Sequence, residues 1–151
     1  MSGIFDEGRM LQVLGACCPE GETLSAGVHG ITLQVNKKKT SFFDVYVGIT
    51  EHCLLVAECE ERKYLTAAYQ MLPDMRKTVA EDVGVCFPFG DIQSCVIKSA
   101  MMGAVNCSIT FRDGSFLRLQ LPKRGGLGGG MPRHAEYREK IIARLESLQR
   151  Y

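Results

Sequence analysis

The sequence predicts an α+β fold that is mostly β: a bent antiparallel barrel of about seven strands, capped by a C-terminal amphipathic helix and preceded by an N-terminal helix. Two observations lead to this prediction. Segments in which apolar and polar residues alternate follow one another through short turns, which is typical of antiparallel strands. The last segment instead has apolar residues at helical spacing, so one helix is expected to cover the open end of the sheet.

The clearest strand pair flanks the turn Arg112–Gly114. A three-residue loop there pairs Ile109 with Leu117, whereas a two-residue loop would set Ile109 opposite Arg118 and mix apolar with charged side chains. Because a slip of one residue turns every side chain to the other face, a buried face selects the three-residue loop. This loop needs Gly114 in the left-handed conformation of a G1 bulge. The same register pairs Cys107 with Leu119 and Val105 with Leu121.

The chain before this hairpin begins with a predicted helix. Apolar residues at helical spacing favour a helix within residues 1–22, and Pro19 ends it. The strands then occupy residues 23–121. The first of them contains Gly27 and Gly30, which indicate a bend or a bulge.

Several more strands follow from the same alternation. The segment 53–59 is apolar on both faces, and the segment 64–82 fits a helix and a strand equally well, so both structures stay open for it. The segments with clear alternation are 43–49, 83–87 and 92–99.

The C-terminal part predicts a loop and a helix. Residues 122–132 form a glycine-rich loop, and residues 133–150 form the closing helix. No repeat or domain boundary interrupts the chain, so residues 1–151 are expected to form a single domain. The apolar stripe of the helix consists of Tyr137, Ile141, Leu145 and Leu148.

Composition and charge exclude several classes. The net charge of +1 gives no global reason to expect a nucleic-acid partner. No apolar run is long enough for a transmembrane helix, and the N-terminus lacks the pattern of a signal peptide, so a cytoplasmic location is expected. The seven cysteines are odd in number and have no CxxC spacing, which favours small core residues in a reducing compartment over zinc ligands or disulfides.

Four features, taken in order, resemble bacterial pleckstrin-homology-like domains: the segments 47–56, 87–92 and 109–119, and the terminal helix. The resemblance covers about residues 23–150, and the chain departs from it at 64–82 and 125–130. It implies a seven-stranded, helix-capped sheet that serves as a binding or assembly module, usually without catalysis. We therefore expect a non-catalytic module whose partner is a protein, or a second copy that pairs through a sheet edge.

Two groups of basic residues are candidate ligand sites. Lys37, Lys38 and Lys39 lie in a predicted hairpin loop, 36–41, where three ammonium groups would meet an anionic headgroup or a phosphate; the alternative is a solvated turn. The second group follows the glycine loop, whose backbone amides can hold a phosphate at a helix N-terminus; the alternative is a linker. Its members are Arg124, Arg133 and His134.

No motif predicts catalysis, a metal or a cofactor. The neighbours His52 and Cys53 would point to opposite sides of an extended chain, and no set of Ser, His and Asp stands out. The sequence therefore predicts a non-enzymatic protein without a cofactor.

Overall fold

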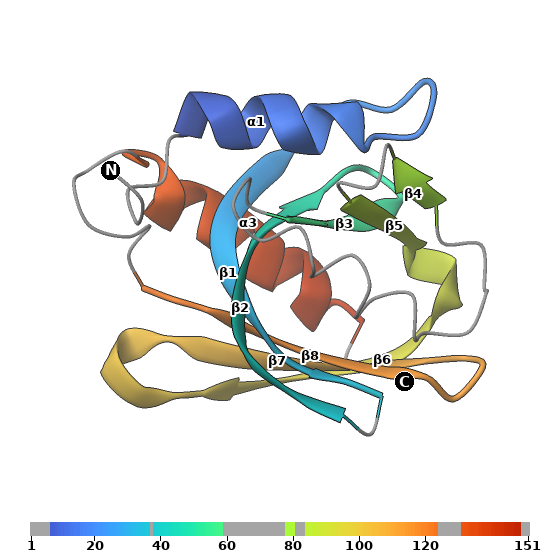
Figure 1. Cartoon of the computed structure of the whole chain (residues 1–151), viewed down its shortest axis with the longest axis vertical. Helices are drawn as coiled ribbons and strands as arrows, with labels where there is room; N and C mark the ends of the chain where they lie inside the picture. Colours follow the sequence, from blue (N-terminus) through green and yellow to red (C-terminus); the bar gives the residue numbers. More distant parts are fainter. Residues whose placement is uncertain (1–6, 37, 59–77, 81–83, 124–130, 149–151) are drawn as a thin grey trace.

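The computed structural model describes residues 7–36, 38–58, 78–80, 84–123 and 131–148 of the chain. In these residues eight antiparallel strands form one sheet, with one helix before the strands and one after them (Figure 1). The α+β, mostly β class expected from the sequence is confirmed. In chain order the elements are α1 (Glu7–Ala16), β1 (Ala26–Val35), β2 (Lys38–Ile49), β3 (Cys53–Glu58), β4 (Thr78–Ala80), β5 (Gly84–Pro88), β6 (Ile92–Ser99), β7 (Val105–Phe111), β8 (Phe116–Leu121) and α3 (His134–Glu146), with short 3-10 turns at Phe89–Asp91 and Met101–Gly103.

The sheet is open, so the expected barrel is wrong for the part of the chain described. The strand order is β4-β5-β3-β2-β1-β8-β7-β6, which makes β4 and β6 the two edges of the sheet that the described residues form. The 3-10 turn Phe89–Asp91 carries the chain from one half of the sheet to the other, so the consecutive strands β5 and β6 are not neighbours. The helix α3 packs against β1 and β6 and lies between the two halves (Figure 1). The strand number exceeds seven because the short β4 lies within the segment 64–82, which the sequence left open.

The two helices cover opposite faces of the β1–β2–β3 part of the sheet. Along β3, Leu54 and Val56 face the core that contains Ile141 and Leu145 of α3. The intervening residues Cys53, Leu55 and Ala57 face a second cluster with Met10 and Leu14 of α1. This arrangement explains why the segment is apolar at consecutive positions, because both faces of β3 are buried.

The irregularity in β1 lies elsewhere than the glycines suggested. The register shifts between Thr32 and Gln34 in the pairings with both β2 and β8. The glycines permit close packing instead. A Cβ atom at Gly27 would lie 2.7 Å from Leu14 Cδ1, and one at Gly30 would lie 2.8 Å from a methyl group of Val47.

The β7–β8 hairpin has the register that the sequence predicted. Ile109 is opposite Leu117, and the same register continues to the ends of both strands. The loop contains three residues, because Phe111 donates its backbone N–H to the carbonyl of Ser115 at 2.9 Å. Gly114 has φ +91°, the left-handed conformation that this loop requires.

Candidate functional site

The predicted lysine loop is shorter than expected. Val35 pairs with Lys38, so Lys38 and Lys39 begin β2 and only two residues turn the chain between the strands. Lys37 lies outside the described residues, as does Arg124 of the second predicted group. The expectation of a polar loop through residues 36–41 is therefore wrong. The strand pattern of β2 extends farther toward the N-terminus than the alternation from Phe43 onward indicated.

Arg133 forms an ion pair within the protein. It lies at the N-cap of α3, and its Nε atom donates to Glu7 Oε2 at 3.0 Å. Its backbone N–H donates to Glu7 Oε1 at 2.9 Å, and its guanidinium stacks on the ring of Tyr137. The hydrogen bond with Glu7 is the main reason that the pKa of Arg133 is raised. These contacts assign Arg133 a role in joining α3 to α1.

His134 is buried and also forms a hydrogen bond within the protein. Its Nε2 atom lies 2.8 Å from the carbonyl oxygen of Pro122, and a carbonyl only accepts, so Nε2 carries the proton. Its Nδ1 atom is buried without a hydrogen-bond partner in the described part of the chain. Burial is the main cause that lowers the pKa of His134. The structure thus brings Arg133 and His134 together with Glu7, and the neutral His134 adds no positive charge for an anion.

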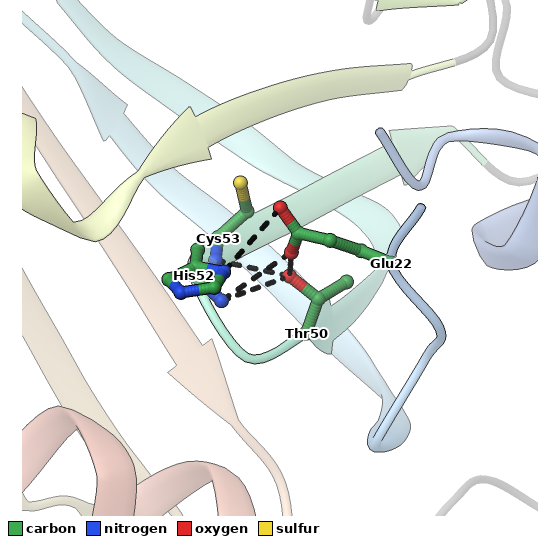
Figure 2. A network of polar contacts seen from close by, with 4 residues as sticks. All are labelled: Glu22, Thr50, His52 and Cys53. Atoms are coloured by element: carbon green, nitrogen blue, oxygen red, sulfur yellow. Dashed lines mark hydrogen bonds and ion pairs between the residues drawn. The ribbon is translucent and has the colours of Figure 1, made fainter. Parts of the chain in front are cut away.

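The segment that follows α1 is tied to the β2–β3 turn by a polar network (Figure 2). Thr50 donates its hydroxyl to Glu22, and its oxygen accepts the backbone N–H of Cys53 at 3.0 Å. The imidazole of His52 lies 3.6 Å from Glu22 and is largely exposed. The hydrogen bond from Thr50 is the largest cause that lowers the pKa of Glu22. The Cys53 sulfur points away from the His52 ring (Figure 2), so the arrangement is not that of a nucleophile and its base.

Three thiols belong to the apolar cluster between α1 and the sheet, next to this turn. The register of β3 and β5 places Cys53 and Cys86 on one face, and Cys17 packs into the same cluster. The pKa of Cys86 is raised, first by burial and then by a hydrogen bond with the Cys53 thiol. Since the thiolate is the reactive form, burial keeps Cys86 unreactive near neutral pH. Among the described residues, no three His, Cys, Asp or Glu side chains are placed to hold a metal ion.

The edge strand β6 is the part of the described surface with the strongest features of an interaction site. Ala100 donates its backbone N–H to Ala104 at 2.8 Å, and hydrogen-bonded pairs alternate along an antiparallel ladder. The backbone groups of Cys95 and Ser99 therefore point away from β7, toward the side of β6 on which the described residues place no further strand. Val96 is 46% exposed on this strand.

The turn after β6 exposes two methionines. Met101 is 83% exposed and Met102 is 91% exposed. With Val96, they are the large hydrophobic side chains that the described residues expose. Met102 also has φ 59° and ψ 34°, a left-handed conformation that costs a non-glycine residue about 1–2 kcal/mol. We call residues Met101–Gly103 the tip.

The tip is held in place by α3. Arg138 donates from Nη2 to the carbonyl of Gly103 at 2.6 Å, and its Nε lies 3.5 Å from the carbonyl of Leu121. The stem of Lys123 lies against Gly103, where a Cβ atom would be 2.7 Å from Lys123 Cδ. The two exposed methionines, of which Met102 is strained, thus lie on a fixed turn. The sequence patterns above did not single out this segment, although two consecutive methionines in place of Gly, Asn or Asp were a usable signal.

Comparisons with known proteins add information about the fold. No protein-family model matches the chain, and no curated protein matches it in sequence. A solved structure that is similar is the C-terminal domain of an unknown protein from Leishmania infantum, with 11% sequence identity and a TM-score of 0.50. The match covers 93% of this chain and 97% of that one, so the likeness extends over nearly the whole fold. The part of the chain that the structure describes contains no helix long and apolar enough to cross a membrane.

Proposed function

We propose that the protein is a non-catalytic interaction module that binds an extended strand of a partner protein along the edge of β6. The observation that carries the proposal is the coincidence of an eight-residue edge strand with the exposed side chains of Val96, Met101 and Met102. Edge strands are the usual site of strand addition, in which main-chain hydrogen bonds supply affinity and alternate side chains supply specificity. Methionine side chains adapt readily to different apolar partners.

The strain at Met102 supports the same proposal. A left-handed residue in a turn is normally Gly or Asn, which adopt this conformation at little cost. An exposed apolar residue in that conformation contributes no burial within the protein, so stability does not explain its presence. Such outliers concentrate at binding sites, where the cost is offset by contacts with a partner.

Selection of peptides tests the proposal. Random ten-residue peptides displayed on phage are selected against the immobilised protein, and the enriched peptides are then titrated against labelled protein. Strand addition predicts shifts of the Cys95 and Ser99 amide resonances. The change Ser99→Pro removes the amide that points toward the open edge, so it is expected to weaken binding about tenfold.

The matched control is Ser99→Ala, which keeps the backbone N–H and is expected to bind as the unchanged protein does. Val96→Lys, which adds a second positive charge to the edge strand, is also expected to weaken binding. If the enriched peptides shift resonances elsewhere and not along β6, the proposal is wrong. A selection that yields no peptide able to shift the β6 amides leads to the same conclusion.

Binding of an anionic headgroup or a phosphate through Lys37, Lys38 and Lys39 stays a prediction from the sequence. Its test is retention on vesicles that contain anionic lipid. Equal retention of the unchanged protein and of the variant with all three lysines replaced by alanine would dismiss this site.

A further inference from the structure

The surroundings of the tip carry positive charge. Lys98 is exposed near the end of β6, and Lys123 is exposed with its stem against Gly103. Arg138 reaches the carbonyl of Gly103 from α3. Basic side chains from β6, from the segment after β8 and from α3 therefore lie near the tip, although the net charge of the whole chain is only +1.

This charge discriminates between possible occupants of the β6 edge. We propose that the partner strand is acidic where it reaches the tip, with carboxylates beside Lys98, Lys123 and Arg138 and an apolar residue near Val96. The inference rests on the proposed function and adds the chemical class of the partner. Charge complementarity of this kind chiefly sets specificity and the rate of association.

The same surface is less suited to a membrane. Exposed apolar residues with basic neighbours also occur in proteins that bind anionic lipid. Here, however, the tip continues directly into an edge strand whose backbone groups at Cys95 and Ser99 point outward. Such groups need hydrogen-bond partners, which a peptide strand supplies and the hydrocarbon region of a bilayer does not. The observations therefore favour a protein strand.

The test uses fluorescein-labelled ten-residue peptides of one alternating Thr/Val sequence. Two peptides carry three glutamates, at the N-terminal end in one and at the C-terminal end in the other, so that both strand directions are covered. Two matched peptides carry lysines at the same positions. The better acidic peptide is expected to bind about tenfold more tightly than its lysine counterpart at low salt. The difference should shrink near 1 M salt, where the screening length falls to about 3 Å.

Variants of the protein locate the effect. The double change Lys98→Glu/Lys123→Glu should reverse the preference, so that the lysine peptide binds more tightly. The control Lys140→Glu changes an exposed lysine of α3 that lies two residues after Arg138, and thus about 200° around the helix axis from it. It should leave the preference unchanged. Arg138 is kept, because it holds the tip, and the melting temperature of each variant shows that the fold is intact.

The outcomes separate the inference from the proposed function. Peptides that shift the β6 amides with equal affinity for both charges would overturn the inference alone. Peptides that never shift these amides would overturn the proposed function as well. In a parallel arm, vesicles of phosphatidylserine and phosphatidylcholine are mixed with the protein. Retention on these vesicles that is lost in Met101→Ser/Met102→Ser, without peptide binding at β6, would identify the tip as a lipid contact and overturn the inference.

Discussion

Glu7, the first residue of α1, accepts hydrogen bonds from both the side chain and the backbone of Arg133, which lies 126 positions later at the N-cap of α3. The carboxylate is buried, with a residue exposure of 7%, whereas the Arg133 side chain is about half exposed. This contact connects the two helices that cover opposite faces of the sheet.

The first prediction concerns this pair. Arg133→Met should lower the melting temperature by a few degrees, because it leaves the Glu7 carboxylate buried without its cation. Adding Glu7→Gln removes the buried charge, so the double variant should melt above Arg133→Met alone. Thermal unfolding followed by circular dichroism measures both. A double variant that melts below the single variant would contradict this account.

The second prediction concerns the β7–β8 loop. Gly114→Val should cost more than about 1 kcal/mol, because it forces a β-branched residue to a positive φ. The control Gly90→Val adds the same side chain where no atom lies within 4 Å and no positive φ is required, so it should cost clearly less. Urea denaturation gives both free energies. Equal costs would show that the turn conformation is not the reason.

The third prediction is a pH dependence from His134. Burial lowers its pKa in the folded protein, so the unfolded chain binds a proton first as the pH falls. This component of stability is fully present above the ordinary pKa of about 6.5 and is lost as the pH falls from there to the lower folded value. His134→Gln, which can still donate to Pro122, should flatten the stability curve in that window. Denaturant unfolding between pH 5 and 8, roughly the range in which histidine titrates, measures the curve.

The fourth prediction concerns the thiols. Burial is the main cause that raises the pKa of both Cys95 and Cys107 to about 12, so alkylation at pH 8 should leave them unmodified in the folded protein. Cys18 is only partly buried and should react before them. Peptide mapping after brief treatment with iodoacetamide identifies the modified positions. Both protected thiols should become reactive in guanidinium chloride, which serves as the control.

The sequence predicted local features better than long-range ones. The register of Ile109 with Leu117 follows from the alternation of apolar and polar residues and from the left-handed conformation that the loop requires of Gly114. Both signals lie within a few neighbouring positions of the sequence. Whether the sheet is open or closed depends instead on which distant strands pair, and the alternation within β5 and β6 does not indicate their neighbours in the sheet. The link between Glu7 and Arg133 was not predicted for the same reason.

The candidate site was predicted only in part. A sheet edge was expected to be the contact surface, but nothing in the alternation of residues 92–99 identified β6 as an edge. The exposed tip was missed, because the alternation that predicts the strands does not show which side chains between two strands remain in solvent. The predicted basic residue Arg133 lies against a carboxylate that only the folded chain brings to it.

Because β3 is buried on both faces, its apolar residues do not determine its register. A shift of this strand by one position would turn Cys53 and Leu55 toward the core in place of Leu54 and Val56, and either set would still contact apolar side chains. The alignment must then be specified by polar bonds at the strand end, where Thr50 joins Glu22 and caps the Cys53 amide. A few hydrogen bonds at one short connection thereby decide which side chains each helix meets.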